Sequence, residues 1–104
     1  MNSEQYIKNM DKEIGQRIRD LRVKSNLTVE ELSDFLVITP GYYGLIERGE
    51  RSLPIRYLVT LSTIFQVSQE YITTGSGKKP IKFTNPKVFL ENAIKLYSSC
   101  HITK

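Results

Sequence analysis

Residues 39–49 read Thr-Pro-Gly-Tyr-Tyr-Gly-Leu-Ile-Glu-Arg-Gly, and no other stretch constrains the fold of this chain as tightly. Thr39 is a residue type that caps a helix N-terminus, and Pro40 takes the first helical position, where its missing N–H costs nothing. Gly49 is the residue type that ends a helix in the left-handed conformation. The stretch therefore predicts a helix of about nine residues, short but long enough to lie in a DNA groove.

A second short helix is predicted just before it. Thr28-Val-Glu-Glu31 is a capping box, in which the Thr28 hydroxyl and the Glu31 carboxylate each accept from the other residue's backbone N–H. Residues 37–38 then form the turn. We expect the buried face of this helix to consist of three apolar residues, Leu32, Phe35 and Leu36. Paired short helices of this kind present side chains to the major groove of DNA.

Three further helices complete the pattern. The first carries apolar residues at steps of three and four (Ile7, Met10, Ile14, Ile18 and Leu21) and ends near Ser25. It either runs continuously from about Ser3 or begins afresh at Asp11. Pro54 opens a fourth helix, whose apolar side is Leu58, Leu61, Ile64 and Phe65, and Ser68 starts a fifth that Gly75 ends. Five short helices and no competing strand pattern predict an all-α fold.

Length and cysteine usage set further bounds. A chain of 104 residues holds one domain plus, at most, an appendage, and a core of that size can fold without disulfides. The single Cys100 excludes an intrachain disulfide and favours a reducing compartment. No apolar run approaches the ~18 residues of a membrane span, and the first residues lack the pattern of a signal peptide. We therefore expect a cytoplasmic protein without membrane contact.

The charge is unevenly placed. The net charge is +4, but residues 1–77 carry 9 basic and 10 acidic side chains, whereas residues 78–104 carry 6 lysines and only Glu91. The excess positive charge thus lies outside the two capped helices. A solvated lysine-rich tail and a phosphate-contacting tail explain it equally well.

The C-terminal part has its own pattern. Residues 76–85 have linker composition, and Asn85-Pro86 repeats the signal for a helix start. A helix over 86–104 would carry a broad apolar stripe that is unstable alone in water. We expect it to form a homodimer through Phe89, Leu90, Ala93, Ile94, Leu96 and Tyr97. The alternatives are that it folds back on the first or fifth helix, or binds another protein.

Enzymatic function is not indicated. Cys100 and His101 are neighbours near the end of the chain, and two ligands do not make a closed zinc site. Gly75-Ser-Gly77 is too short for a phosphate-binding loop. We expect a protein that is not an enzyme and that has no metal site and no cofactor.

From Ile14 to Gly75 the sequence resembles the Cro/C1-type (XRE) helix-turn-helix regulators. The matching pieces, in the family's order and spacing, are residues 14–22, Leu27-Thr-Val-Glu-Glu-Leu32, Tyr42 with Ile46-Glu-Arg-Gly49, and Val67-Ser68. The resemblance implies a five-helix, lambda-repressor-like DNA-binding domain over residues 1–75 and a bacterial or phage origin. The start Ile-Gly-Gln-Arg-Ile18 and the C-terminal helix are also similar to the SinR-like regulators.

The resemblance assigns structural roles. It implies that Arg22 and Glu47 form an ion pair between the first and third helices, which fixes how the recognition helix is held. It places Leu21, Leu32, Ile46, Leu58 and Leu61 in the core. Tyr43 stands where the family has an aliphatic residue, so we expect it in the core as well.

The same resemblance places base-reading side chains at the start of the recognition helix, which here are Pro40, Gly41 and Leu45. Pro and Gly carry no hydrogen-bonding side chain, and Leu45 offers only apolar contact, for example with a thymine methyl group. Val29 replaces a phosphate-binding Gln. The remaining contacts would go to phosphates, from helix N-termini, hydroxyls and three arginines. The predicted DNA-binding set is Thr28, Thr39, Pro40, Gly41, Tyr42, Leu45, Arg48, Arg51 and Arg56.

Two hypotheses follow from this departure. The first is a dimeric repressor of double-stranded DNA that relies on backbone contacts and DNA shape. The second is a regulator that reads DNA poorly and acts on a protein partner, either a DNA-binding paralogue or a toxin.

Overall fold

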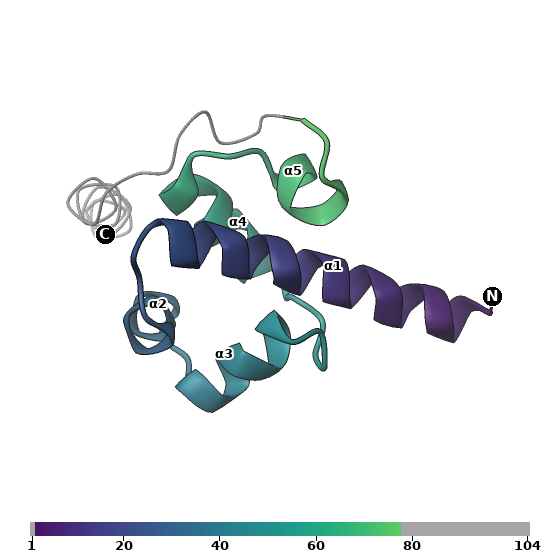
Figure 1. Ribbon diagram of the computed structural model, residues 1–104, viewed down its shortest axis with the longest axis horizontal. Helices are drawn as coiled ribbons and strands as arrows, with labels where there is room; N and C mark the ends of the chain where they lie inside the picture. The colour runs from purple at the N-terminus through teal and green to yellow at the C-terminus, as the bar shows by residue number, and fades with distance from the viewer. Residues whose placement is uncertain (1, 78–104) are drawn as a thin grey trace, which may run out of the picture.

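The computed structural model describes residues 2–77, and every regular element in that part of the chain is a helix (Figure 1). The helices are α1 (Ser3–Lys24), α2 (Val29–Leu36), α3 (Pro40–Glu47), α4 (Ile55–Phe65) and α5 (Gln69–Thr74). The prediction of an all-α, five-helix domain is confirmed. The predicted helix over residues 86–104 lies outside the described residues.

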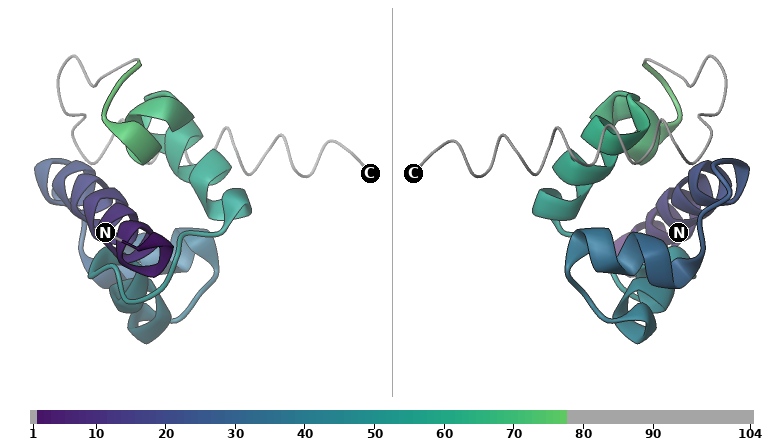
Figure 2. Two further views of the ribbon diagram at one scale, coloured as in Figure 1. Left: turned by 90° about the vertical axis from the view of Figure 1, so that its right-hand side faces the viewer. Right: turned by 90° about the vertical axis from the view of Figure 1, so that its left-hand side faces the viewer.

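Helix α1 runs through the middle of the domain. Figure 1 shows α2 and α3 on one side of α1 and α5 on the other, with α4 crossing behind α1, and Figure 2 shows α2 and α3 opposite α5 from both ends of the long axis. α1 contacts both α3 and α5, while α2 packs on α3 and α4 on α5. The helix-turn-helix thus depends on α1 for its position.

α1 is one continuous helix. Asn2 caps it by accepting a hydrogen bond from the backbone N–H of Gln5 at 2.8 Å. Asp11 lies inside this helix and starts no new one, and its carboxylate accepts a hydrogen bond from Ser52 Oγ at 2.8 Å. The first half of α1 extends beyond the other helices (Figure 1), so Tyr6 and Ile7 of its apolar stripe are 62% and 49% exposed.

The core draws on all five helices and the connections between them. Its buried apolar residues are Ile14, Ile18, Leu21, Leu27, Leu32, Leu36, Tyr43, Ile46, Leu61, Ile64, Phe65, Val67 and Ile72. Tyr43 is 1% exposed, so its predicted core position is confirmed. Leu58, predicted in the core, is only half-buried and packs against its edge.

The prediction for Phe35 is wrong, because its side chain is exposed. The buried face of α2 consists of Leu32, Ser33 and Leu36. Ser33 can occupy that face because its Oγ donates to the Val29 carbonyl at 2.6 Å, which satisfies the buried hydroxyl. Phe35 then falls at the margin of the face, because successive helical residues turn by about 100°.

The helix ends follow the predicted signals closely. Gly49 follows α3 with φ +78°, and Gly75 ends α5 with φ +85°. Pro54 and Ser68 are the N-caps of α4 and α5, so each helix begins one residue later than predicted. α2 ends at Leu36, and its C-cap is Val37, a β-branched residue in the left-handed conformation (φ 57°) whose side chain is 88% exposed. Within residues 2–77, no helix is both long and apolar enough to cross a membrane.

Candidate nucleic-acid interface

Helices α2 and α3 form a fully capped helix–turn–helix. The capping box of α2 is complete: Thr28 Oγ accepts from the Glu31 amide at 3.0 Å, and Glu31 Oε1 accepts from the Thr28 amide at 2.8 Å. Thr39 Oγ accepts from the Tyr42 amide at 3.1 Å and caps α3. The turn is closed by the Ile38 amide, which donates to the Ser33 carbonyl at 3.1 Å. The local sequence therefore fixes both helix starts and the turn between them.

The C-terminal end of α3 lies directly against α1. A Cβ atom at Gly15 would lie 2.3 Å from the carbonyl oxygen of Glu47 and 2.7 Å from that of Ile46. Because backbone atoms cannot move aside as a side chain can, only glycine permits this approach. Gly15 was part of the matched sequence pattern, but its role as the contact point between α1 and α3 was not predicted.

The predicted ion pair between Arg22 and Glu47 is present and bidentate. Arg22 Nε donates to Glu47 Oε2 and Arg22 Nη2 donates to Glu47 Oε1, both at 2.9 Å, and both side chains are about nine-tenths buried. Arg22 Nη1 also donates to the Leu27 carbonyl at 2.9 Å. The pair therefore links α1, the α1–α2 connection and α3.

Burial and hydrogen bonding act in opposite directions on Glu47. Burial favours the neutral acid, but the hydrogen bonds from Arg22 and Tyr43 and the positive charge of Arg22 outweigh it and hold the pKa of Glu47 below its ordinary value. The hydrogen bond to Glu47 raises the pKa of Arg22 in turn. The pair is therefore ionised throughout the neutral pH range.

None of the nine predicted DNA-binding residues is buried. Tyr42 and Leu45 are half-buried and the other seven are exposed. A Cβ atom at Gly41 would meet nothing within 4 Å, and one at Gly44 would meet only the flexible end of Arg48. Leu45 is not among the half-buried apolar residues that pack against the core. The outward face of α3 therefore lacks side chains at Gly41 and Gly44, and the half-buried Leu45 is the apolar side chain next to them.

The charged groups around α3 are unequal in availability. Arg48 Nε donates to Glu50 Oε2 at 2.6 Å, and the Arg56 guanidinium lies 5.1 Å from the centre of the Tyr57 ring. Arg51 is exposed and has no carboxylate partner within residues 2–77. The first turn of α2 carries Glu30 and Glu31, whereas that of α3 carries no acid. A phosphate is thus better accommodated at the start of α3 than at the start of α2.

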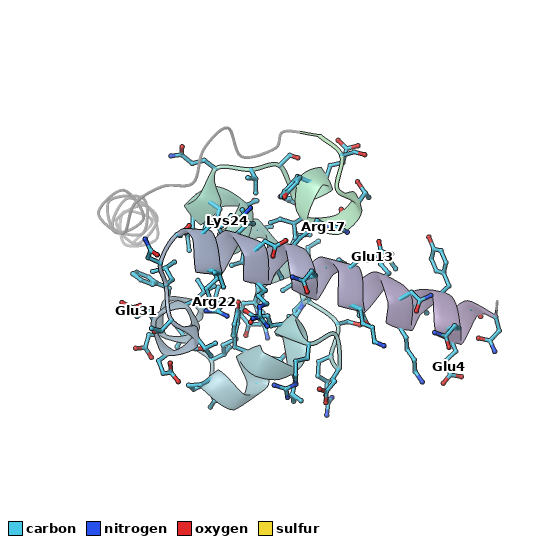
Figure 3. All side chains as sticks on the ribbon, in the orientation of Figure 1. Glu4, Glu13, Arg17, Arg22, Lys24 and Glu31 are labelled. Carbon is cyan, nitrogen blue, oxygen red and sulfur yellow. The ribbon has the colours of Figure 1, made fainter. Side chains whose placement is uncertain are left out.

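A second arginine of α1 was missed by the sequence analysis. Arg17 donates from Nε to the Ile72 carbonyl at 2.8 Å and from Nη2 to the Thr73 carbonyl at 2.9 Å, so it satisfies the open end of α5. Figure 3 shows Arg17 on the α5 side of α1 and Arg22 on the opposite side. Arg17 therefore links α1 to α5, and Arg22 links α1 to α3.

Several predicted residues lie outside the described part of the chain. They are the dimerisation set Phe89, Leu90, Ala93, Ile94, Leu96 and Tyr97, together with Cys100 and His101. Within residues 2–77, no three His, Cys, Asp or Glu side chains are grouped so that they could hold a metal ion.

Comparison with known proteins identifies this arrangement. A family model described as "Helix-turn-helix" matches residues 18–72, which include α2, α3 and most of the core. The chain belongs to this helix-turn-helix family. The resemblance to Cro/C1-type regulators is thereby confirmed, whereas the narrower resemblance to SinR-like regulators stays a prediction.

Three Bacillus subtilis (strain 168) proteins are similar to the chain. The uncharacterized HTH-type transcriptional regulator YobD is 35% identical over 73% of this chain and 70% of its own length. The uncharacterized regulator YqaE is 29% identical over 79% of the chain and 65% of its length. YonR, an SPbeta prophage-derived HTH-type regulator, is 31% identical over 60% and 57%. No solved structure matches the chain.

Proposed function

We propose that this protein is a dimeric, cytoplasmic repressor of transcription that binds double-stranded DNA mainly through the phosphate backbone and DNA shape. The observation that carries the proposal is a fully capped α2–turn–α3 unit whose outward face is accessible but poor in base-reading groups. Family membership and regulatory relatives support the DNA-binding part. We infer no enzymatic activity.

Phosphate contacts would supply most of the affinity. The start of α3 offers backbone N–H groups without a competing acid, and the Thr39 hydroxyl caps it. The Tyr42 hydroxyl is a further candidate donor. Arg51 is free of carboxylate partners within the described residues and is the strongest candidate among the arginines. Arg48 has its Nε on Glu50 Oε2, whose negative charge offsets that of the guanidinium, so we rank Arg48 below Arg51.

Base readout would fall to Leu45. The neighbouring Gly41 and Gly44 carry no side chain, so α3 can approach the groove closely and bring Leu45 against a base edge. An apolar side chain recognises the C5-methyl group of thymine. We therefore expect specificity to depend on one or two thymines in each half-site.

The first experiment is fluorescence anisotropy with a duplex from the protein's own promoter region and a scrambled duplex, over a salt series. Specific binding whose logarithm falls steeply with the logarithm of salt concentration would support the repressor proposal, and the slope gives the number of phosphates contacted. Equal, weak binding to both duplexes would reject it.

Readout by Leu45 is tested by replacing thymines of the bound duplex with deoxyuridine, which removes only the methyl group. Wild-type protein should lose affinity at the contacted positions, and Leu45→Ala should lose none there because the apolar partner is already gone. An equal loss in both proteins would assign the thymine contact to another residue.

We place the dimer contact in the predicted C-terminal helix. Ile94→Asp would put a charge in the apolar stripe and should convert the dimer to a monomer, with the helical signal of the first domain unchanged. Light scattering measures the mass. An unchanged mass would contradict this assignment, and Asn92→Asp, outside the predicted contact set, is the control for one added negative charge.

The lack of side chains on the outward face of α3 and the acidic first turn of α2 favour a second candidate, a regulator that acts on a protein partner. The partner would be a DNA-binding paralogue with which the chain hetero-oligomerises, or a toxin bound through residues 86–99. Specific recovery of such a protein with the wild-type chain but not with Ile94→Asp would support it, and recovery of none would count against it.

A further inference from the structure

The Tyr43 hydroxyl is a polar group inside the core, with a definite partner. Among residues 2–77 this side chain is the largest of the fully buried ones, and its hydroxyl donates to Glu47 Oε2 at 2.5 Å. Burial, together with this hydrogen bond, raises the pKa of Tyr43 well above its ordinary value, so the phenol stays protonated and acts as a donor.

This donor completes the shell of the Glu47 carboxylate. Oε2 accepts from both Tyr43 and Arg22 Nε, and Oε1 accepts from Arg22 Nη2. Without the hydroxyl, one buried acceptor site of a charged group would lose its partner. Tyr43 and Glu47 are one turn apart on α3, whereas Arg22 comes from α1, so the hydroxyl orients the carboxylate toward the neighbouring helix.

Three features hold α3 on the rest of the domain: its core residues Tyr43 and Ile46, the close backbone approach at Gly15, and the ion pair of Glu47. The first two fill space without hydrogen bonds between the helices. The bidentate pair of Glu47 with Arg22 adds a directional, hydrogen-bonded link between α3 and α1. If Glu47 turned away from Arg22, this directional link would be lost while the core residues stayed in place.

We propose that Tyr43 is a positioning residue for DNA binding, whose hydroxyl locks Glu47 onto Arg22 and so fixes the face that α3 presents to the groove. This inference rests on the proposed function. It assigns to the hydroxyl a role that volume and hydrophobicity alone would not require, since phenylalanine would fill the same space.

The test compares Tyr43→Phe with Ile72→Val, a core substitution in α5 away from the network that also lowers stability modestly. Both variants are studied where they remain folded by circular dichroism. For Tyr43→Phe we expect a loss of specific duplex affinity of about threefold to tenfold, because the competent position of α3 is less populated. Ile72→Val should bind like wild type.

Two measurements without DNA keep the inference separate from the proposed function. Amide hydrogen exchange should be faster in α3 of Tyr43→Phe, with α4 and α5 unchanged, and acid unfolding should begin at a higher pH because Glu47 has lost a donor. Ile72→Val should not show faster exchange confined to α3, and its acid unfolding should shift only by as much as its loss of stability at neutral pH requires. Unchanged α3 protection in Tyr43→Phe would overturn the positioning role. A wild-type protein that binds no duplex would reject the proposed function alone.

Discussion

In the part of the chain that the structure describes, two serine side chains are buried in the core, and they differ in whether the hydroxyl has a hydrogen-bond partner. Ser33 Oγ donates to the Val29 carbonyl, whereas Ser25 Oγ is buried without a hydrogen-bond partner among the described residues. A buried hydroxyl without a partner has lost its hydrogen bonds to water without forming new ones, which lowers the free energy of unfolding. The pair thus separates the effect of burial from that of hydrogen bonding.

Ser25→Ala should leave the free energy of unfolding unchanged or raise it by up to about 1 kcal/mol, because the substitution removes an unpaired polar atom. Ser33→Ala is the matched control and should lower it by about 1 kcal/mol. Urea unfolding followed by circular dichroism measures both. A large loss in Ser25→Ala would reveal a partner, such as a bound water.

At the scale of single helices, the sequence predicted what depends on local chemistry. The capping box at Thr28, the proline at the start of α3 and the glycines after α3 and α5 act within a few residues, so pattern reasoning found them. The exposed Phe35 and the contact at Gly15 depend on how whole helices pack, which no local pattern records. The ion pair of Arg22 and Glu47 was found only through the family resemblance.

The hydrogen bond of the Tyr43 hydroxyl combines a local sequence spacing with a buried position that depends on packing. The spacing of four residues from Tyr43 to Glu47 was a usable signal, because side chains at that spacing meet on a helix. The family resemblance indicates only an apolar core position there, and volume and hydropathy do not distinguish a buried tyrosine with a hydrogen-bonded hydroxyl from one without.

The contact between α1 and α3 should be intolerant of a single added carbon. Gly15→Ala forces a Cβ atom against the Glu47 carbonyl, so we expect a loss of about 1–3 kcal/mol in stability in spite of alanine's better helix propensity. Gly41→Ala is the control: its Cβ meets open space, and stability should rise by about 0.5 kcal/mol. Thermal unfolding compares the two. Equal effects would mean that the helices adjust freely.

The turn of the helix-turn-helix contains a residue, Val37, whose backbone conformation is strained, and substitution could relieve this strain. Val37 has φ 57°, a conformation that costs a β-branched residue about 1–2 kcal/mol, and its exposed side chain packs on little. Val37→Gly should therefore raise the free energy of unfolding by about 0.5–1 kcal/mol. Val37→Ala, which retains most of the strain, should change it less. A destabilised glycine variant would show that the valine side chain makes a contact of value.

For the whole domain, the titration of Glu47 predicts an acid limit to stability. Its pKa is lowered in the folded state, so its contribution is present above the unfolded value of about 4.5 and is lost as the pH falls through the folded value. The free energy of unfolding should fall below pH 4.5 in wild type and fall less steeply in Glu47→Gln. Parallel curves would assign the acid limit to other carboxylates.

The open surroundings of Gly41 have a consequence for the evolvability of this regulator. Because nothing lies within 4 Å of the missing Cβ, a longer side chain could be added there without disturbing the core or the ion pair that holds α3. At this position, unlike at Tyr43, a change of side chain is thus physically separable from stability. New operator preferences could be selected at Gly41 in a library of variants that all share one folded scaffold, with glutamine or asparagine introducing adenine recognition where the present chain has none.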